Sequence, residues 1–437
     1  AFYTILSILL TLIFNIFYES IILSILNTQI LLLQIFFIVV VVYNVVISYV
    51  GTLKKDEIIT HSISSNNFAI LIPAHNEEVV VGKLVDSFKK SNYPKELFDV
   101  YVICDNCTDE TSKVAEKSGA KVCIRTDTTK KGKGYVIEWM LDRLYKMEKD
   151  NIYYDAILIV DADNLVDKNF LKEIDYKIQE GYEVIQGYME AKNPDDSVVT
   201  KSYSFSYWST NRMYQLARHK LGLSAQIGGF GVAIKLDALK KVGWNSYSLT
   251  EDLEFTQRYI MKTGNPIAWA HNAIIYDEKP IGLAPSIYQR IRWKSGRINC
   301  AINYIIPLSK NTLLKKSMIS FDSLMYLISP TRFSIFTLFG IMMFVNLMKT
   351  IFENIPLITN IFTFNFTLYF VLTILYLSLP IYALILENKK SQIPKLFLSY
   401  FFSLSNIPVS IIGFIKRNNN IWSHTKHTRN VDIDKKK

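Results

Sequence analysis

The chain has 437 residues, of which 50% are hydrophobic and 20% are charged, and its formal net charge is +10. This composition excludes a disordered tail and a collagen-like or other fibrous repeat. The four cysteines are too few and too unevenly spaced for a disulfide framework or a four-thiolate zinc site, so we expect a reduced, cytosol-facing compartment.

The first predicted element is a pair of membrane helices in residues 1–55. This segment is almost uncharged, and Asn27 and Thr28 divide it into two apolar runs, each near the ~20 residues that span hydrocarbon. We therefore predict a transmembrane helical hairpin. Lys54 and Lys55 place its end in the cytoplasm by the positive-inside rule. A cleaved signal peptide is the alternative, but the segment has neither a basic start nor a small-residue cleavage site.

Residues 62–282 have the composition of a soluble domain. Short β-rich runs alternate with amphipathic stretches, which is the pattern of an α/β fold. In such folds the ligand site lies at the carboxyl ends of the strands. The predicted strands are FAILIP, DVYVIC, AKVCIR, DAILIVDAD, YEVIQ and FGVAIK.

The remaining chain returns to the membrane. Residues 283–329 mix cations with aromatic and aliphatic residues at helical spacing, which is typical of amphipathic interfacial helices. Residues 330–416 contain three apolar runs and predict transmembrane helices, and residues 417–437 form a basic tail. Three crossings would leave the tail outside, whereas its cations favour the cytoplasm. Either residues 317–328 help to form an extra crossing or the last apolar run is re-entrant.

Two carboxylates, Asp161 and Asp163, follow the strand DAILIV. Residues two apart on an extended chain point the same way, so these side chains would repel each other unless they share a cation. A hard divalent ion that bridges phosphate oxygens is the usual solution. A solvated turn is the alternative for an isolated D-x-D.

Other strand ends supply groups suited to a nucleotide. The first strand is followed by His75 and Glu77, and the second ends near Asp105, where a ligand would lie. Lys133 lies on a glycine-bearing loop before a helix, a place suited to phosphate, although a solvated charge run is the alternative. The C-x-x-C that surrounds Asp105 has no thioredoxin-like context, which argues against a redox pair.

Two motifs complete an ordered set. Thr250-Glu251-Asp252 opens an amphipathic helix, and Gln289, Arg292 and Trp293 lie on the interfacial segment. With P-x-[YH]-N-E, D-x-D, T-E-D and Q-x-x-R-W in this order, the chain resembles the membrane-embedded processive synthases of glycosyltransferase family 2. That group contains cellulose, mixed-linkage β-glucan, hyaluronan, chitin-oligosaccharide and poly-N-acetylglucosamine synthases. The resemblance implies an α/β nucleotide-diphospho-sugar transferase domain, GT-A-like, inserted between α-helical transmembrane segments.

The resemblance also assigns roles at matching positions. Asp252 would be the general base, with Glu251 orienting acceptor hydroxyls, because a carboxylate can take the proton of an attacking hydroxyl. Helix capping is the alternative role for Asp252. UDP would be bound by His75, Glu77, Asp105, Lys133, Asp161 and Arg292. Mg²⁺ or Mn²⁺ would be bound by Asp163 and Asp161, and the acceptor by Gln289, Trp293, Gly228 and Gly229.

The function implied is a processive inverting glycosyltransferase in the bacterial plasma membrane, with its catalytic domain in the cytoplasm. UDP-glucose and a β-glucan of cellulose-like or mixed linkage are the first expectation, and a poly-N-acetylglucosamine or hyaluronan-type product is the second. A nonprocessive transferase that modifies a membrane lipid is the alternative from another class. The expected partners are the UDP-sugar, the growing polysaccharide, membrane lipid and accessory export subunits. Nucleic acid is not expected, because the cations cluster at membrane boundaries and near the diphosphate site.

The C-terminal tail has a composition beyond what orientation in a membrane requires. Its segment from Trp422 to Arg429 resembles the tails of related bacterial synthases that fold back towards the site. We therefore predict that it gates UDP-sugar entry. His424 and His427 lack a third ligand, which argues against a metal site in the tail.

Overall fold

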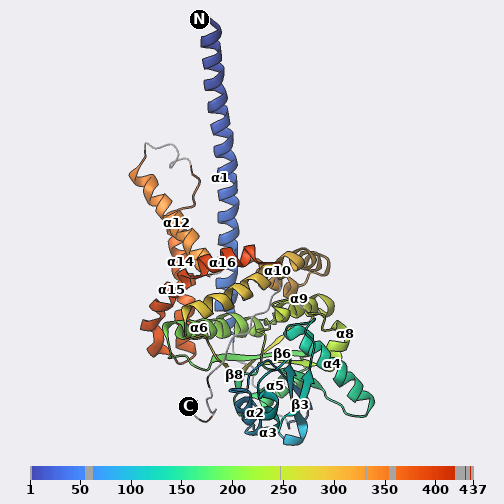
Figure 1. The fold of residues 1–437 in the computed structure, drawn as a ribbon. Helices are drawn as coiled ribbons and strands as arrows, with labels where there is room; N and C mark the ends of the chain where they lie inside the picture. Colours follow the sequence, from blue (N-terminus) through green and yellow to red (C-terminus); the bar gives the residue numbers. More distant parts are fainter. Residues whose placement is uncertain are drawn as a thin grey trace. The chain divides into compact units, whose positions relative to one another are not determined.

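The computed structural model describes residues 2–54, 63–246, 248–329, 332–353, 361–418, 429 and 434, with side chains from residue 21 onward except those of 332–334 and 336. The chain divides into two compact units. The first comprises Ala1–Val46 and Ser329–Leu379, and the second comprises Ile47–Ile328 and Pro380–Lys437. Figure 1 shows the order of the helices and strands along the chain.

The first unit is built from long apolar helices. It contains most of α1 (Phe2–Leu53), α12 (Arg332–Ile351) and most of α14 (Phe366–Leu386). The amide of the buried Gln34 donates to the carbonyl of Phe362 at 2.8 Å and accepts from the hydroxyl of Tyr369. Polar contacts of this kind join helices where no water can satisfy a polar group.

The predicted N-terminal hairpin is wrong, because α1 is one uninterrupted helix. Neither Asn27 nor Thr28 breaks it, and the Thr28 hydroxyl donates to the carbonyl of Ser24 at 2.9 Å, within the same helix. A polar pair without glycine or proline therefore did not suffice for a turn. Among the described residues, three segments are long and apolar enough to cross a membrane: Ile21–Leu53, Phe366–Leu386 and Lys390–Ile415.

The second unit contains an eight-stranded mixed sheet, and the α/β prediction is confirmed. The strands β1, β2, β3 and β4 are parallel, β7 is antiparallel to β4 and β6, β6 is parallel to β8, and β5 is antiparallel to β8. The sheet order is β3-β2-β1-β4-β7-β6-β8-β5. The bounds are β1 Phe68–Ala74, β2 Phe98–Asp105, β3 Lys121–Arg125, β4 Ala156–Ile159, β5 Leu165–Val166, β6 Val184–Ala191, β7 Val232–Lys235 and β8 Ala268–Asp277.

Helices cover both faces of this sheet. Alternate residues of β1 enter opposite cores, since Ala69 and Leu71 pack with α4, α6, α8 and α9, whereas Phe68, Ile70 and Ile72 pack with α2, α3 and α5. This explains why the strands read as continuous apolar runs. The bounds are α2 Val81–Lys89, α3 Thr111–Lys117, α4 Lys133–Lys149, α5 Phe170–Gln179, α6 Val198–Thr210, α7 Ala217–Lys220, α8 Leu236–Val242 and α9 Glu251–Thr263, with short helical turns η1 Lys95–Leu97 and η2 Asn211–Leu216.

The segment after the sheet forms α10 (Leu283–Lys315) and α11 (Met318–Ile328), where the sequence predicts interfacial helices. The α11 helix has 11 residues, too few for the extra crossing considered for this segment. Its buried Asp322 instead pairs with the buried Arg218 at 3.0 Å. Beyond α14, the chain forms η3 (Lys390–Lys395), α15 (Leu396–Leu404) and α16 (Asn406–Ile415).

All six predicted strands are present, but β5 and β8 were not predicted. In β8, alanine and asparagine interrupt the apolar run, and both are depleted in strands. The β8 strand is also the one that brings Asp277 to the carboxyl edge of the sheet, because β8, β6 and β4 run in the same direction. This edge holds the candidate site.

Candidate active site

A cavity of about 500 Å³ opens at the carboxyl ends of β1, β2, β4 and β8. Strands β2 and β4 flank β1 on opposite sides, so the cavity lies where the chain reverses its direction of travel across the sheet. The structure brings all of the predicted site residues to its wall: His75, Glu77, Asp105, Lys133, Asp161, Asp163, Gly228, Gly229, Glu251, Asp252, Gln289, Arg292 and Trp293. Their individual roles remain predictions.

At one end of the cavity, Asp105 is held by three neighbours. The guanidinium of Arg125 donates to its carboxylate at 2.5 Å, and the amide of Asn106 donates to the same oxygen at 3.0 Å. The Nδ1 of His75 donates to the carbonyl of Asp105 at 2.7 Å, since a carbonyl can only accept. Arg125 was not predicted. Its position at the end of β3, beside Asp105 in the register, is the signal that could have identified it.

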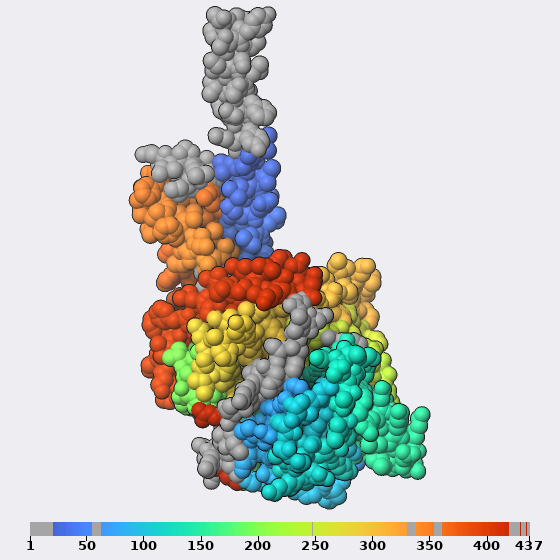
Figure 2. All heavy atoms as spheres, viewed as in Figure 1, coloured from blue at the N-terminus to red at the C-terminus, as the bar shows by residue number. Residues whose placement is uncertain are grey.

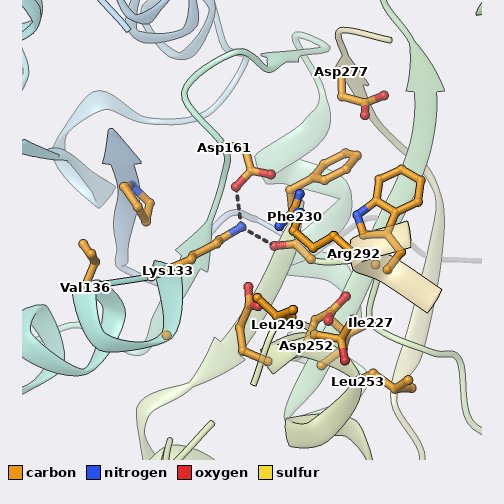
Figure 3. Close-up of a pocket in the computed structure, with 18 of the residues that line it drawn as sticks. Lys133, Val136, Asp161, Ile227, Phe230, Leu249, Asp252, Leu253, Asp277 and Arg292 are labelled. Atoms are coloured by element: carbon orange, nitrogen blue, oxygen red, sulfur yellow. Dashed lines mark hydrogen bonds and ion pairs between the residues drawn. The ribbon is translucent and has the colours of Figure 1, made fainter. Parts of the chain in front are cut away.

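Lys133 lies at the centre of the cavity, at the first turn of α4 (Figure 3). Its ammonium donates to the carboxylate of Asp161 and, at 2.6 Å, to the carbonyl of Gly229. Burial disfavours its charge, but Asp161, Glu251 and Asp252 outweigh burial and raise the pKa of Lys133. Lys133 therefore stays positively charged. It lies between Asp161, which follows β4, and the acids Glu251 and Asp252 on α9.

Two buried acids, Asp163 and Asp277, also line the cavity at this edge of the sheet. The carboxylate of Asp163 accepts from the backbone of Glu278 at 3.1 Å, and Asp277 accepts from the hydroxyl of Tyr207 at 3.1 Å and pairs with Lys279. Burial raises the pKa of Asp277 to about 6, with Lys279 acting against burial and Asp163 adding to it. The other oxygen of Asp277, Oδ1, is buried and has no hydrogen-bond partner within the described part of the chain.

These two carboxylates fit a hard divalent cation. Oxygen donors suit Mg²⁺ and Mn²⁺, and Mg²⁺ in particular is usually bound by one or two carboxylates together with substrate phosphates. The described residues contain no cluster of three or more His, Cys, Asp or Glu side chains that would bind a metal unaided. Asp163 and the unpartnered oxygen of Asp277 could therefore hold a metal only together with a phosphate-bearing ligand.

At the opposite end, Glu251 and Asp252 begin α9 beside the glycines that follow Ile227. Gly229 has a φ of +89°, which favours glycine, and a Cβ atom there would lie 3.4 Å from a carboxylate oxygen of Asp252. The backbone N–H of Gly228 donates to Gln186 at 2.9 Å. These contacts hold the Gly228–Gly229 loop close to Glu251 and Asp252. A second substrate that reacts at these acids would require such an arrangement.

The α10 helix contributes the last wall. Trp293 is 37% exposed, and its ring meets that of Tyr203 edge-on at 6.1 Å. The hydroxyl of Tyr203 also donates to Gln289 at 3.3 Å. The ammonium of the buried Lys279 lies 5.5 Å from the centre of the Trp293 ring. This packing holds Trp293 at the cavity wall with part of its surface accessible. Arg297 also lines the cavity and was not predicted.

The described part of the C-terminal tail contacts the rim of the cavity. The backbone N–H of Arg429 donates to the Glu278 carboxylate at 3.0 Å, and its guanidinium pairs with Asp196. Asp434 pairs with Lys90 at 2.6 Å and with Lys168 at 3.2 Å. Trp422, His424 and His427 lie outside the described residues, so the predicted gating by this segment stays a prediction.

We expect catalysis to rise with pH through the titration of the acid pair. Burial, and then repulsion from Asp252, raises the pKa of Glu251 to about 7, and burial likewise raises the pKa of Asp252. A base acts only when deprotonated, so kcat/KM should increase as pH rises through the titration of these two acids. In Glu251→Gln the part of the profile near pH 7 that belongs to Glu251 should be lost, whereas the rise from Asp252 should remain, since burial raises the pKa of Asp252. Pre-steady-state transfer measured across pH tests this, and a flat profile through the same range would contradict it.

Comparisons with known proteins agree with this geometry at the level of fold and family. Residues 66–296, more than half of the chain, match the family described as glycosyltransferase like family 2. The chain is 26% identical over 263 residues to the probable glycosyltransferase YdaM of Bacillus subtilis, covering 58% of this chain and 60% of that protein. It is 26% identical over 272 residues to the beta-monoglucosyldiacylglycerol synthase of Nostoc sp., covering 60% of this chain and 55% of that protein. The chain therefore spans little more than half the length of these relatives.

A solved structure shows the same fold. Mannosyltransferase PcManGT from Pyrobaculum calidifontis, in complex with GDP-Man and Mn²⁺, matches with a TM-score of 0.52 at 12% identity. The match covers 88% of this chain and 99% of that one. At this identity the likeness shows the fold alone, which is GT-A-like with apolar helices flanking the domain.

Proposed function

The chain belongs to glycosyltransferase like family 2, and from this premise we propose that it is an inverting transferase that moves a sugar from UDP to an acceptor hydroxyl at a membrane. The main support is the arrangement around Lys133, which places a cation between Asp161 and the acid pair Glu251 and Asp252 in one cavity. Such a cavity can hold a diphosphate at one end and deprotonate a hydroxyl at the other.

The transfer is a single displacement. The acceptor hydroxyl oxygen attacks the anomeric carbon while its proton passes to the carboxylate of Asp252, and UDP leaves with the electrons of the broken carbon–oxygen bond. Lys133 and Arg292 line the cavity on the side of the leaving diphosphate and stabilise its charge. Mg²⁺ or Mn²⁺, held by Asp163 with Asp161 or Asp277, supplies further positive charge to the diphosphate when bound.

UDP-glucose is the proposed donor, and two acceptors are supported by different observations. The accessible face of Trp293, which lines the same cavity as the acid pair, favours a sugar ring, hence a growing β-glucan. The name of the Nostoc relative, a beta-monoglucosyldiacylglycerol synthase, favours a lipid hydroxyl. In both cases the acceptor is presented at a membrane, which accords with the three segments that could cross one.

Product length distinguishes these acceptors. Full-length protein in proteoliposomes is incubated with one radiolabelled UDP-sugar at a time and Mn²⁺, and the product is separated by solvent extraction and digested with linkage-specific glycanases. A water-insoluble or size-heterogeneous glycan from UDP-glucose supports polymerisation, and an extractable lipid monoglucoside supports the lipid acceptor. Free glucose alone, or no product from any UDP-sugar, would overturn the proposed function.

A further inference from the structure

The last apolar segment of the chain is divided into short helices. Residues 390–415 are long and apolar enough to cross a membrane, yet they form η3, then α15 with 9 residues and α16 with 10. Each helix is ~15 Å long, half of the ~30 Å hydrocarbon layer. Pro408 explains the break, because it has no N–H and its ring would clash with the carbonyl of Leu404 four residues earlier.

One side of these helices packs on the catalytic unit. At Gly413 a Cβ atom would lie 2.9 Å from the Cβ of Lys294, so only glycine lets α16 lie this close to α10. The hydroxyl of Ser295 donates to the Gly413 carbonyl at 3.2 Å. At the break, the guanidinium of Arg290 donates to Asn406 at 2.9 Å and to Ser405 at 2.8 Å. The α15 helix packs in turn on α6. Figure 2 shows the atoms of α16 lying along those of α10.

The opposite side is apolar and accessible. Large side chains project from both helices without covering contacts, among them Phe397 at 63% exposure and Ile411 at 58%. A contiguous apolar surface of this kind marks an interaction site. The exposed residues are Phe397, Leu398, Phe401, Leu404, Ile407, Ile411, Phe414 and Ile415. We call this surface the α15–α16 face.

The two ends of the segment lie on the catalytic side. Just after α14, the carboxylate of Glu387 accepts from the hydroxyl of Tyr188 at 2.9 Å and from Arg212 at 2.6 Å. Just after α16, the carbonyl of Arg417 accepts from Asn299 at 3.3 Å, and Arg429 contacts Glu278 farther along the tail. A helix that crossed the membrane between Lys390 and Ile415 would separate these two ends by a bilayer.

We propose that the α15–α16 face lies in the surface of a lipid bilayer, as an in-plane contact, and that the C-terminal tail remains on the side of the catalytic domain. Lipid is the occupant that fits, because cations bracket the apolar face and complement anionic headgroups. They are Lys390 and Lys395 before it, and Lys416 and Arg417 after it.

This placement has a consequence for the site. The α10 helix contacts α16 through Arg290 and Ser295, and it lines the cavity through Gln289, Arg292 and Trp293. One helix thus separates the lipid contact from the acceptor end of the cavity. The acceptor end is therefore held near the headgroup layer, where a membrane-bound acceptor can reach it.

Depth-dependent fluorescence quenching tests the proposal on the full-length protein. A fluorescent amino acid is incorporated at Phe401, at Ile411 or at the buried Val409, and the protein is reconstituted with lipids that carry a nitroxide either near the headgroup or at the chain end. We expect quenching at 401 and 411 by the shallow nitroxide to exceed that by the deep one about twofold, since in-plane helices lie only ~5–10 Å deep. The probe at 409 should be quenched far less.

The side of the tail is measured separately. A probe at Lys416, in vesicles with the catalytic domain facing outward, should be quenched by external iodide. Stronger quenching by the deep nitroxide at 401, together with protection of position 416 from iodide, would show a crossing helix and overturn the proposal. Absence of lipid quenching at both 401 and 411 would also overturn it, because the face would then be covered by protein. The same quenching is measured in vesicles with and without anionic lipid. This comparison distinguishes insertion of the apolar face from attraction of the flanking cations to anionic headgroups.

Discussion

The Asp252→Asn variant is expected to bind UDP as the wild type does and to transfer sugar about 10²–10⁴ times more slowly, the range that a general base contributes. The substitution preserves the size of a side chain that lies at the first turn of α9, near Gly229. It removes the group proposed to take the acceptor proton. It leaves the UDP end of the cavity, where Asp105 and Arg125 pair, unchanged.

A control variant makes this result specific. Glu251→Gln removes the adjacent negative charge while keeping the proposed base, so it should retain much more activity than Asp252→Asn. Transfer rates are measured in single turnover with radiolabelled UDP-glucose, and UDP affinity by calorimetry. A native transfer rate in Asp252→Asn would refute the assignment of the base, and a matching loss in both variants would indicate that the two acids act as one unit.

The site was predictable where its residues follow strands or open helices. His75, Asp105 and Asp161 each follow an apolar strand, and parallel strands bring their carboxyl ends to one edge. That rule needs only the order of the elements, so the sequence sufficed to group these residues. The T-E-D and Q-x-x-R-W segments were predictable for another reason, since each combines an uncommon residue pattern with helical spacing.

The residues that were missed depend on contacts between distant segments. Asp277 ends a strand that was not predicted and Lys279 follows it, so in the sequence both look like charges in a surface turn. Only the fold buries them beside Asp163. The hairpin failed because hydropathy identifies apolar length and cannot locate a turn. The last apolar run was ambiguous because Pro408 indicates a break without indicating where each half packs.

The Asp163→Asn variant should lower transfer about 10²–10³-fold and weaken UDP binding only when Mn²⁺ is present, as expected for loss of a charge that holds a cation. The carboxylate of Asp163 accepts a backbone hydrogen bond from Glu278, which an amide oxygen can replace. Local structure should therefore persist while the charge is lost. The Mn²⁺ concentration for half-maximal activity should rise in parallel.

Asp167→Asn is the matched control, since Asp167 comes directly after β5, accepts from the backbone of Asn169 as Asp163 accepts from that of Glu278, and does not line the cavity. It should leave both activity and Mn²⁺ dependence unchanged. Asp277→Asn separates the two models of the metal site: a loss like that of Asp163→Asn indicates that both acids hold the cation, whereas native Mn²⁺ dependence leaves Asp163 with Asp161. UDP titrations with Mn²⁺ and with EDTA measure this directly, and an Asp163→Asn protein with native affinity in both would exclude Asp163 as a ligand.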